Sequence, residues 1–379
     1  MQKRILLIGS LPKSLVNFRG KLLEELSIMG HEVHACANEI LKDQESCTKL
    51  KKIGVTIHSI PIERNGLNPI KDFITFLSII KLYLRLRPNI VLSYTIKPVV
   101  WGGLAAFLFP RIKYFALITG LGYAFTGSAH GKRLIIKNII KILYKISLKK
   151  ASAVIFQNPD DNKEFINLKI IPKSKKAFIV NGSGVDLDYF RSNGFPEGKV
   201  IFLMISRLLR DKGVREFIEA GQIINRENHV ANFFLLGDID SNPDAISRED
   251  IELLTNSKWF KWMDFAEDVR PFINNCHVFV LPSYREGTPR TVLEAMSMER
   301  PIITTNSAGC KETVEQGGNG YLVPIKDPLS LSIAIKKFIN NPEIIIQMGK
   351  KSRIIAAEKY DVNKVNLQMI KALGLLKGL

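Results

Sequence analysis

Short apolar runs, rich in β-branched and aromatic residues, alternate with helical patterns along most of this 379-residue chain. Because consecutive parallel strands need a helical crossover between them, this alternation predicts parallel sheets with helices on both faces. A first series of strands is expected at residues 5–8, 32–36, 56–60, 90–93, 114–118 and 153–156. A second series is expected at residues 200–205, 231–236, 259–263, 278–281, 301–304 and 320–323. The chain is therefore expected to form two Rossmann-like, doubly wound halves.

Apolar residues at helical spacing fill the intervals between these strands, for example at residues 20–29, 71–87, 214–225 and 271–275. The segment 191–198 is rich in turn-forming residues, which favours a boundary between the two halves at that point. We expect a first domain over residues 1–194 and a second domain over residues 195–359. The chain is long enough for two domains, and its hydrophobic content of 46% can supply two cores.

The positive charge of the chain is concentrated in its first half. Residues 1–196 contain 30 Lys and Arg against 13 Asp and Glu, a net charge of +17, whereas residues 197–379 contain 24 against 23, a net charge of +1. Such asymmetry predicts an anionic partner for the first half: membrane lipid, nucleic acid or a phosphate-bearing acceptor. The four cysteines form no Cys-x-x-Cys pair, so neither a disulfide framework nor a zinc site is expected. No apolar stretch reaches the roughly 18 residues of a spanning helix.

The stretch from Leu281 to Glu294 combines a strand end, a tight loop and a helix start. Glu286 and Glu294 lie eight positions apart in it. Thr288 is expected to be the N-cap of the helix and Pro289 its first residue. Two acceptor side chains beside a helix start, where backbone N–H groups attract anions, suit a ligand with hydroxyl and phosphate groups, such as a nucleotide sugar. The alternative is that Glu294 is an exposed helix residue and Glu286 merely complements the helix dipole.

Two cations lie in the loop that follows the first strand of the second series. Arg207 and Lys212 are five positions apart there, ahead of a helix. An Arg fork and a Lys point charge suit a diphosphate, and positive charge would stabilise a departing nucleoside diphosphate. Taken alone, both also fit ordinary solvated loop cations. Gly237 ends the next strand at the sheet edge where ligands bind in open α/β folds, and a simple turn is its alternative.

The motif around Glu286 and Glu294 resembles the Glu-x7-Glu element of family-4 glycosyltransferases, which are retaining enzymes of the GT-B fold. The resemblance extends over almost the whole chain, in family order. The other matching stretches are Tyr94-Thr-Ile-Lys-Pro98, Ile118-Thr-Gly-Leu-Gly-Tyr123, Phe156-Gln-Asn-Pro-Asp160, Gly182-Ser-Gly-Val-Asp186, Ser206-Arg-Leu-Leu-Arg-Asp-Lys-Gly213 and Pro301-Ile-Ile-Thr-Thr-Asn306. The resemblance implies two Rossmann-like domains facing across a cleft, with residues 360–379 crossing back to the first. The similar subgroup builds bacterial surface polysaccharides or lipid-linked oligosaccharides.

The resemblance also implies roles for residues of the motif. In the family, the first Glu contacts the donor sugar and the second accepts hydrogen bonds from the ribose hydroxyls, which assigns these roles to Glu286 and Glu294. Gly287 and Thr288 would offer backbone N–H groups to the donor. The family reaction is usually described as front-face attack, in which the donor β-phosphate oxygen takes the acceptor proton. No protein base, cofactor or essential metal is then expected.

Candidate acceptor contacts lie in loops of the first half. They are Ser10, Asn17, Arg19, Lys97, Gly120 and Gly122. Residues 17–20 are expected to precede the first helix, in a loop that faces the interdomain cleft of GT-B enzymes. The glycines allow close approach of the backbone to a ligand. Each residue taken singly also fits a plain polar loop, and no Gly-x-Gly-x-x-Gly pattern supports a nicotinamide cofactor.

At two positions this chain departs from the family pattern, and the family's residue roles cannot be assigned there. Many members carry a His that touches the donor sugar, where this chain has Thr119 or Gly120; His130 is expected to be a surface residue. Asp264 stands where the family often has Gly, in a segment expected to form the base pocket. The contacts to the sugar and to the base are therefore left open.

A basic amphipathic helix is expected over residues 132–150. Its cations recur at four-residue intervals: Arg133, Lys137, Lys141, Lys145 and Lys149. Such a helix is typical of membrane-surface binding, and each cation contributes about 1 kcal/mol near an anionic leaflet. The alternative is a core-packed helix with a solvated Lys face. The helix at residues 72–87 is a further candidate for this surface, although its apolar ring favours burial of most of the helix.

The resemblance, together with these patterns, implies a retaining GT-B glycosyltransferase. It would move a sugar from a UDP-sugar, with N-acetylhexosamine favoured, to a polyprenyl-diphosphate-linked saccharide. The expected location is peripheral, on the anionic cytoplasmic face of the bacterial inner membrane. One alternative is a UDP-sugar 2-epimerase of the same fold, which needs no acceptor. Another is a basic nucleic-acid-binding protein, but residues 132–150 contain Tyr144 as their one aromatic, so no nucleic-acid partner is expected.

Overall fold

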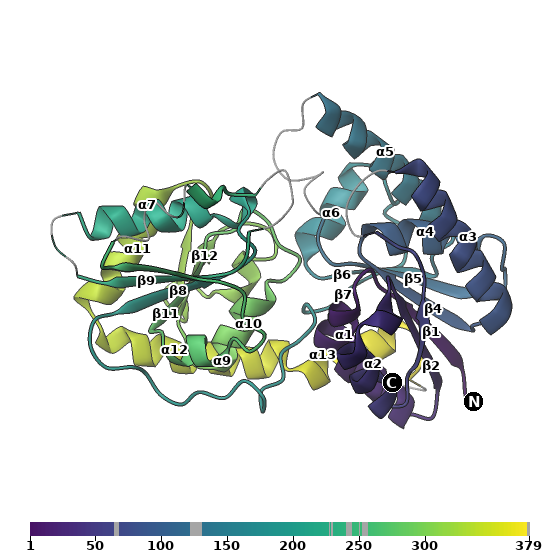
Figure 1. Ribbon diagram of the computed structural model, residues 1–379, viewed down its shortest axis with the longest axis horizontal. Helices are drawn as coiled ribbons and strands as arrows, with labels where there is room; N and C mark the ends of the chain where they lie inside the picture. Colours follow the sequence, from purple (N-terminus) through teal and green to yellow (C-terminus); the bar gives the residue numbers. More distant parts are fainter. Residues whose placement is uncertain are drawn as a thin grey trace. The chain divides into compact units, whose positions relative to one another are not determined.

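The structure is a computed structural model that describes residues 1–63, 68–121, 131–226, 228, 230–239, 245–249, 251 and 257–376, without the side chains of residues 132 and 133. Its contacts divide the chain into two compact units, each visible in Figure 1. Unit 1 comprises Met1–Ser183 and Asn363–Leu379, and unit 2 comprises Gly184–Val362. The boundary expected at residues 194/195 lies inside unit 2, because Val185 and Phe190 pack into the core of that unit.

A seven-stranded parallel sheet forms the centre of unit 1, in the order β3-β2-β1-β4-β5-β6-β7. Its strands are β1 (Arg4–Ile8), β2 (Glu32–Ala37), β3 (Thr56–Ser59), β4 (Ile90–Tyr94), β5 (Lys113–Ile118), β6 (Ala153–Phe156) and β7 (Ala177–Ile179). The six predicted strands are confirmed, and the short edge strand β7 was missed. Because β1 pairs with both β2 and β4, the strand order reverses between β1 and β4, which makes this point the topological switch of the sheet.

Helices cover both faces of this sheet (Figure 1). The helices α1 (Pro12–Ile28), α2 (Gln44–Lys52) and α13 (Val362–Ala372) pack on the face that carries Ile5 and Leu7. The helices α3 (Pro69–Leu86), α4 (Ile96–Ala106), α5 (Lys132–Ser147) and α6 (Pro159–Asn167) pack on the face that carries Leu6 and Ile8. Successive strand residues point to opposite faces, so a fully apolar β1 serves both layers.

The first helix begins earlier than predicted. It starts at Pro12 in the first turn, so residues 17–20 lie inside α1 rather than in a loop before it. Leu15, Leu22 and Leu26 recur at helical spacing and are all buried. The helix continues through Gly20, because buried leucines in the turns before and after it pack against the sheet. The space around Gly20 itself is open.

A chain of polar side chains spans strands β2 and β3 of unit 1. The Arg85 guanidinium donates to His58 Nδ1 at 2.9 Å, and His58 Nε2 lies 3.0 Å from His34 Nδ1. His34 Nε2 lies 3.0 Å from Glu32 Oε1, and Arg4 Nε donates to Glu32 Oε2 at 2.7 Å. Because Arg donates only, the hydrogen of His58 is on Nε2 and both imidazoles are used as neutral rings.

A six-stranded parallel sheet forms the centre of unit 2, in the order β10-β9-β8-β11-β12-β13. Its strands are β8 (Ile201–Ile205), β9 (Asn232–Leu236), β10 (Phe260–Met263), β11 (Val278–Leu281), β12 (Ile302–Thr305) and β13 (Gly320–Val323). All six were predicted within a residue or so at each end. The switch point of this sheet lies between β8 and β11, where the strand order reverses.

Unit 2 has helices on both faces of its sheet, with α7 and α11 on one side and α9, α10 and α12 on the other (Figure 1). The helices are α7 (Val214–Ile224), α9 (Arg270–Asn274), α10 (Arg290–Ser297), α11 (Pro328–Asn340) and α12 (Glu343–Ile355). Short turns complete the chain: η1 (Ile40–Lys42) in unit 1, and η3 (Arg210–Lys212), η4 (Lys311–Thr313) and the π-helical η5 (Ala356–Tyr360) in unit 2.

The chain leaves unit 2 beside the point where it enters. The Val185 N–H donates to the Tyr360 carbonyl at 2.8 Å, and the Val362 N–H donates to the Val185 carbonyl at 3.0 Å. Gly184 has φ +71, and a side chain there would clash with the Val362 backbone. Beyond this crossing, Met369 of α13 is buried in the core of unit 1. The predicted return of the last helix to the first domain is therefore confirmed.

Candidate functional site

The predicted donor residues of unit 2 lie in two loops that meet at the switch point of the sheet. Strands β8 and β11 are neighbours, with Phe202 opposite Val278. The loop after β8 contains Arg207 and Lys212, and the loop after β11 contains Glu286. Because parallel strands end at the same edge, both loops occupy the position where ligands bind in open α/β sheets.

Hydrogen bonds hold these two loops together. The Tyr284 N–H donates to the Asp211 carbonyl at 2.8 Å, and the Tyr284 hydroxyl donates to Glu216 Oε1 at 2.5 Å. Gly213, with φ +75, lies so close to the Pro282 carbonyl that a side chain there would clash. Glycine is therefore required at this position, both for its left-handed backbone and for the close approach.

An ion pair between the two loops is the centre of the site. Lys212 Nζ donates to Glu286 Oε1 at 2.5 Å, and the two side chains are 15% and 17% exposed. The Glu286 N–H donates to the Ala308 carbonyl at 2.9 Å, which anchors the backbone of Glu286 to the loop after β12. Charges so far from water need a partner of opposite sign. The pair provides an ammonium suited to phosphate and a carboxylate suited to sugar hydroxyls, in hydrogen-bond contact with each other.

Glu294 is buried on α10, with a side chain that is 10% exposed. Its Oε1 accepts a hydrogen bond from Arg290 Nε at 2.8 Å, one turn earlier on the helix. Burial raises the pKa of Glu294, while the Arg290 guanidinium opposes the rise. The alternative interpretation, an exposed helix glutamate, is therefore wrong for Glu294.

The start of α10 differs by one residue from the prediction. The helix begins at Arg290, and Pro289 is its N-cap residue, with ψ 107 that keeps it extended. The predicted N-cap at Thr288 was wrong because proline lacks an N–H and its fixed φ suits a cap as well as a first helical position. Gly287 is buried, and Gly309 (φ +80) packs against its carbonyl so closely that a side chain would clash.

The other two predicted donor residues lie at the ends of β8 and β9. Arg207 is exposed, unlike Lys212 in the same loop. A side chain at Gly237 would clash with the Ser206 carbonyl, so this glycine allows the two strand ends to pack together. The Gly237 carbonyl accepts a hydrogen bond from Trp262 Nε1 at 3.0 Å, which connects the site to the segment predicted to form the base pocket.

The predicted acceptor residues Ser10 and Lys97 lie at the switch point of unit 1. Ser10 Oγ is 2.9 Å from Thr95 Oγ1, so the two hydroxyls connect the carboxyl ends of β1 and β4. Thr95 has φ +67, a rare conformation for a β-branched residue. Lys97 follows in the first turn of α4, with Nζ 2.7 Å from Asp72 Oδ1 of α3.

Other acceptor candidates are more dispersed. Asn17 is exposed on α1, whereas Arg19 is buried, with its guanidinium 5.4 Å from the centre of the Tyr94 ring. Gly120 follows β5 with φ +121, a conformation that favours glycine. Gly122, together with the nearby His130, lies outside the described residues.

The predicted basic helix is present as α5, but it ends at Ser147, so Lys149 lies just beyond it. Lys137, Lys141 and Lys145 are on the helix, and the side chain of Arg133 is outside the described part. The apolar residues of α5 with exposures between 41% and 61% are Leu134, Ile135, Ile139, Ile142 and Ile146. Ile140 and Tyr144 of the same helix are buried in the core of unit 1. Helix α5 is therefore core-packed on one side, as the alternative expects, and it also leaves these five apolar side chains exposed.

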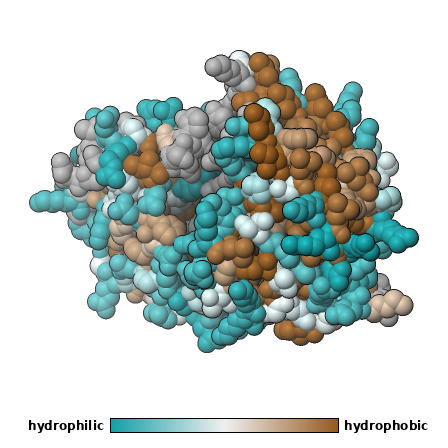
Figure 2. Space-filling model, turned by 45° about the vertical axis from the view of Figure 1, so that its right-hand side comes forward, coloured by the Kyte–Doolittle hydropathy of each residue, from teal (hydrophilic) through white to brown (hydrophobic). Residues whose placement is uncertain are grey.

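Helix α3 exposes a second set of apolar side chains, contrary to the expectation that it is mainly buried. Those with exposures between 47% and 73% are Ile70, Phe73, Ile74, Leu77 and Leu84. Helix α4 packs against both α3 and α5, so the two exposed sets lie on the same layer of unit 1. Figure 2 shows hydrophobic side chains gathered over this part of the unit. We refer to the two sets together as the apolar face of unit 1.

Two residues of these sites were missed from the sequence. Asp72 and Thr95 contact Lys97 and Ser10 respectively. Arg290 was expected to add charge near the donor motif, and it lies four residues before Glu294, the spacing of a helical ion pair. Asp72 and Thr95 act across segments distant in sequence, and no local pattern marks them.

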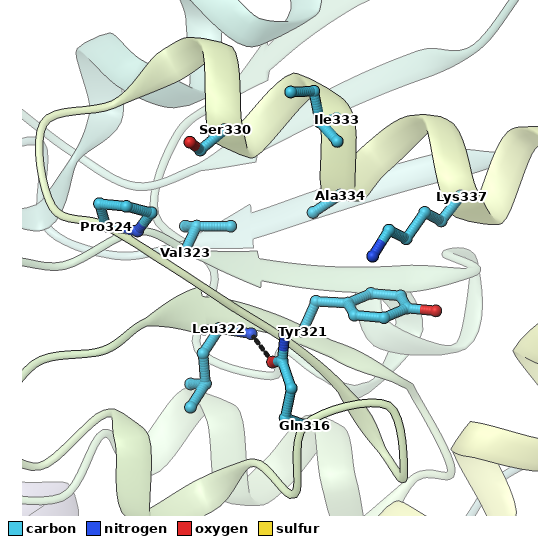
Figure 3. Close-up of a pocket in the computed structure, with 9 residues that line it drawn as sticks. All are labelled: Gln316, Tyr321, Leu322, Val323, Pro324, Ser330, Ile333, Ala334 and Lys337. Atoms are coloured by element: carbon cyan, nitrogen blue, oxygen red, sulfur yellow. Dashed lines mark hydrogen bonds between the residues drawn. The ribbon is translucent and has the colours of Figure 1, made fainter.

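A small pocket in unit 2 lies away from the predicted residues (Figure 3). It measures about 190 Å³ and is lined by residues of β13 and α11, including Tyr321 and Lys337. Lys337 Nζ lies 4.3 Å from the centre of the Tyr321 ring, and the Leu322 N–H donates to Gln316 Oε1 at 2.7 Å. Because β13 is the edge strand of the sheet, this hollow is removed from the switch point.

Within the described ranges, no three His, Cys, Asp or Glu side chains are grouped so that they could hold a metal ion. In the same part of the chain, no helix combines the length and the apolar character that a membrane span requires. All four cysteines are free and buried.

Two protein-family models match this chain. The model described as "Glycosyl transferases group 1" matches residues 186–355, and the model described as "Glycosyl transferase 4-like" matches residues 4–158. The first match covers both switch-point loops of unit 2, and the second covers Ser10 and Lys97.

Relatives with described activities align over most of the chain. The chain is 30% identical, over 94% of its length and 95% of the relative, to N,N'-diacetylbacillosaminyl-diphospho-undecaprenol alpha-1,3-N-acetylgalactosaminyltransferase of Campylobacter jejuni. It is 26% identical, over 80% of both chains, to the capsular polysaccharide biosynthesis glycosyltransferase CapM of Staphylococcus aureus. It is 25% identical, over 90% of its length and 89% of the relative, to UDP-Gal:alpha-D-GlcNAc-diphosphoundecaprenol alpha-1,3-galactosyltransferase of Escherichia coli.

Solved structures share the fold over nearly the full length. Sucrose-phosphate synthase of Thermosynechococcus elongatus aligns with a TM-score of 0.82 at 19% identity, covering 98% of both chains. Anabaena HepE in complex with UDP-glucose aligns with a TM-score of 0.73 at 16% identity, covering 99% of this chain and 100% of that one. At such identities the likeness concerns the fold alone, and with the two doubly wound sheets it confirms the predicted GT-B class.

Proposed function

Because this chain belongs to the group 1, glycosyl transferase 4-like family of glycosyltransferases, we propose that it transfers a sugar from a UDP-sugar to a polyprenyl-diphosphate-linked saccharide. The assembly of bacterial surface polysaccharide or glycan would be its setting. Two relatives support this acceptor, since their names describe undecaprenol-diphosphate substrates. The N-acetylgalactosaminyl activity named for the first relative supports an N-acetylhexosamine as donor sugar.

Unit 2 would bind the donor at its switch point. The observation that carries this proposal is the Lys212–Glu286 ion pair, which bridges the two switch-point loops at 2.5 Å. Lys212 and Arg207 would bind the diphosphate, and Glu286 would accept hydrogen bonds from the sugar. Glu294 would accept hydrogen bonds from the ribose hydroxyls, while Gly287, Thr288 and Gly237 would allow close approach of the backbone to the donor.

The reaction would retain the anomeric configuration. An acceptor hydroxyl attacks the anomeric carbon as the bond from that carbon to the β-phosphate oxygen breaks, and the phosphate oxygen takes the hydroxyl proton. The products are the lengthened saccharide and UDP. Negative charge builds up on the departing diphosphate, and a fixed ammonium such as that of Lys212 stabilises it in the transition state. On this account the chain supplies no base, and Glu286 positions the sugar.

Unit 1 would receive the acceptor at a membrane surface. It contains 32 Lys and Arg against 11 Asp and Glu, a net charge of +21, whereas unit 2 contains 22 against 25, a net charge of −3. Lys137, Lys141 and Lys145 lie on the same helix as exposed isoleucines of the apolar face. Exposed apolar side chains beside cations suit an anionic lipid surface, which satisfies both at once. The expected position is peripheral, on the cytoplasmic face of the inner membrane.

A donor screen tests the activity. The protein is incubated with individual UDP-sugars and a polyprenyl-diphosphate-linked saccharide, and released UDP is measured. We expect release that requires both substrates, with an N-acetylhexosamine donor giving the highest rate. Epimerised sugar nucleotide formed without acceptor would instead indicate the 2-epimerase, and salt-sensitive retention of RNA or DNA without UDP binding would indicate the nucleic-acid-binding alternative.

Vesicle sedimentation tests the membrane surface. Replacing Lys137, Lys141, Lys145 and Lys149 with glutamine should reduce binding to anionic vesicles by about 100–1,000-fold, since four cations at about 1 kcal/mol each contribute about 4 kcal/mol. The matched control replaces four exposed lysines of unit 2, Lys258, Lys261, Lys336 and Lys350. Equal vesicle binding by wild type and the α5 variant would refute this surface.

A further inference from the structure

Lys97 and Asp72 form a buried ion pair that the donor chemistry of unit 2 does not use. Their charged atoms are 2.7 Å apart, and the side chains are 11% and 12% exposed. Lys97 lies in the first turn of α4, and Asp72 lies in the first turn of α3. The pair therefore holds together the beginnings of two helices on the same layer of unit 1.

A lysine at this place is unfavourable unless it binds an anion. The positive end of the α4 dipole repels a cation in the first turn. The Lys97 ammonium is enclosed, and although Asp72 is close, the contact is an ion pair without hydrogen-bond alignment. An ammonium has three N–H donors, and buried donors without acceptors cost free energy. Asp72 offsets the charge but does not satisfy these donors, which is the signature of a site shaped for a further anion.

The position in the sheet indicates where that anion would lie. Lys97 follows β4, at the switch point of unit 1, where open α/β sheets bind ligands. Thr95, just before α4, keeps its strained φ of +67 while its hydroxyl contacts Ser10 at 2.9 Å. Backbone strain at a ligand-binding edge is retained where the surrounding structure imposes it. Pro98 has no N–H and the Val99 N–H donates to the Thr95 carbonyl at 3.1 Å. A phosphate at this edge would therefore meet the N–H groups of Ile96 and Lys97 and the Lys97 ammonium together.

The apolar face of unit 1 indicates which phosphate this is. Asp72 is flanked on α3 by Ile70, Phe73 and Ile74, which are exposed by 73%, 57% and 47%. This part of α3 thus exposes apolar side chains to solvent, while its Asp72 carboxylate contacts Lys97. A ligand with a diphosphate next to a hydrocarbon chain would match both features, whereas a sugar nucleotide has no hydrocarbon chain.

We propose that Lys97 binds the diphosphate of the lipid-linked acceptor and that Asp72 is the positioning residue which holds the Lys97 ammonium at the β4 edge. The proposal rests on the proposed function, because it assumes a polyprenyl-diphosphate acceptor. The hydrocarbon chain would leave the site along the first turns of α3. Lys97 would thereby select acceptors that carry a diphosphate, independently of the sugar that is transferred.

The test compares two acceptors that differ only in the phosphates. One is the saccharide on a polyprenyl diphosphate, and the other is the same saccharide on an alkyl chain. The double variant Lys97→Met/Asp72→Asn removes both charges, so neither is left buried alone, and thermal unfolding checks its fold. We expect the ratio of kcat/KM for the diphosphate acceptor over the alkyl acceptor to fall by about 10–100-fold. The KM for the donor should stay within about twofold of wild type.

Single variants separate positioning from fold stability. Asp72→Asn should lower the ratio by about tenfold through a higher acceptor KM, and Asp72→Glu should recover part of it. The control is Lys49→Met/Glu45→Gln, which removes an exposed ion pair of α2 in the same unit and should leave the ratio unchanged. Inhibition by farnesyl diphosphate, compared with farnesol, gives a second measurement: the double variant should lose the preference for the diphosphate.

The outcomes distinguish a failure of the proposed function from a failure of the proposal for Lys97. If wild type transfers sugar to neither acceptor, the proposed function fails. If wild type prefers the diphosphate acceptor and the double variant keeps that preference, in both transfer and inhibition, Lys97 is structural and the inference is overturned. A rise in donor KM with an unchanged acceptor ratio would assign Lys97 to the donor phosphates and would also overturn it.

Discussion

Replacing Lys212 with methionine removes the ammonium that we place on the donor diphosphate. In the structure this ammonium is 15% exposed and donates to Glu286 at 2.5 Å. A hydrogen bond to a charged group contributes about 1.5–3 kcal/mol, and loss of one preorganised donor to transition-state charge costs about 2.7–4 kcal/mol. We therefore expect kcat/KM for the donor to fall by about 100–1,000-fold, with much of the loss in kcat.

The same substitution removes one partner of the Glu286 carboxylate, the Lys212 ammonium. A fully buried charge left alone costs about 3–5 kcal/mol. Glu286 keeps 17% of its side-chain exposure and can recruit water, so we expect a smaller loss of stability, about 1–2 kcal/mol. The double variant Lys212→Met/Glu286→Gln should regain this stability but not the activity.

The assay measures UDP release during transfer, with thermal unfolding of the same preparations. Arg215→Met is the matched control, because Arg215 forms an exposed ion pair with Glu219 on the following helix, with exposures of 80% and 36%. It should retain nearly full activity. If Lys212→Met keeps more than about a third of wild-type kcat/KM, Lys212 does not act on the donor and the reasoning from the ion pair is refuted.

Three further predictions concern other parts of the molecule. Glu294→Gln should weaken UDP binding about tenfold in calorimetry while leaving 2′,3′-dideoxy-UDP binding unchanged; an equal effect on both would exclude a ribose contact. Burial lowers the pKa of His58 to about 4, below the value of about 6.5 in an unfolded chain. Protons therefore favour the unfolded state, and stability should fall as the pH drops from 6.5 towards 4, by at most about 3 kcal/mol. Urea unfolding of His58→Gln should show a flatter dependence on pH, and a slope identical to that of wild type would contradict a buried, neutral His58 in the folded state. Phe73→Glu/Leu77→Glu should reduce binding to anionic vesicles without changing UDP affinity, whereas unchanged vesicle binding would remove α3 from the membrane surface.

The sequence was sufficient to predict the strands of both sheets and the two loops that contain the proposed donor residues. Strands such as β8 and β11 are uniformly apolar, so burial on both faces is visible from composition alone. Glu286 and Glu294 are close in sequence, so a one-residue error in the predicted start of α10 does not change which loop and helix contain them. The start of α1 at Pro12 differs from the prediction of a loop at residues 17–20, because the turns on both sides of Gly20 supply enough buried leucines to continue the helix.

Contacts between distant segments could not be predicted in this way. Asp72 reads as an ordinary acid in the first turn of a helix, and only the packing of α3 beside α4 brings it to Lys97. The apolar residues of α3 also fit a buried helix, because the helix has buried residues on its other side, including Ile79 and Tyr83. The neighbouring helices determine which of the two apolar sides of α3 faces the core. The local sequence of the helix does not show this.

Hydrogen exchange with and without UDP tests the central claim, the donor site at the switch point of unit 2, most directly. Amides that gain protection report where the nucleotide binds, whatever sugar or acceptor the enzyme uses. We expect protection in the loop that contains Arg207 and Lys212 and from Tyr284 to the end of α10, with Lys212→Met reducing it. Protection confined to the pocket beside Tyr321 and Lys337 (Figure 3), or none at saturating UDP, would contradict the donor site described here.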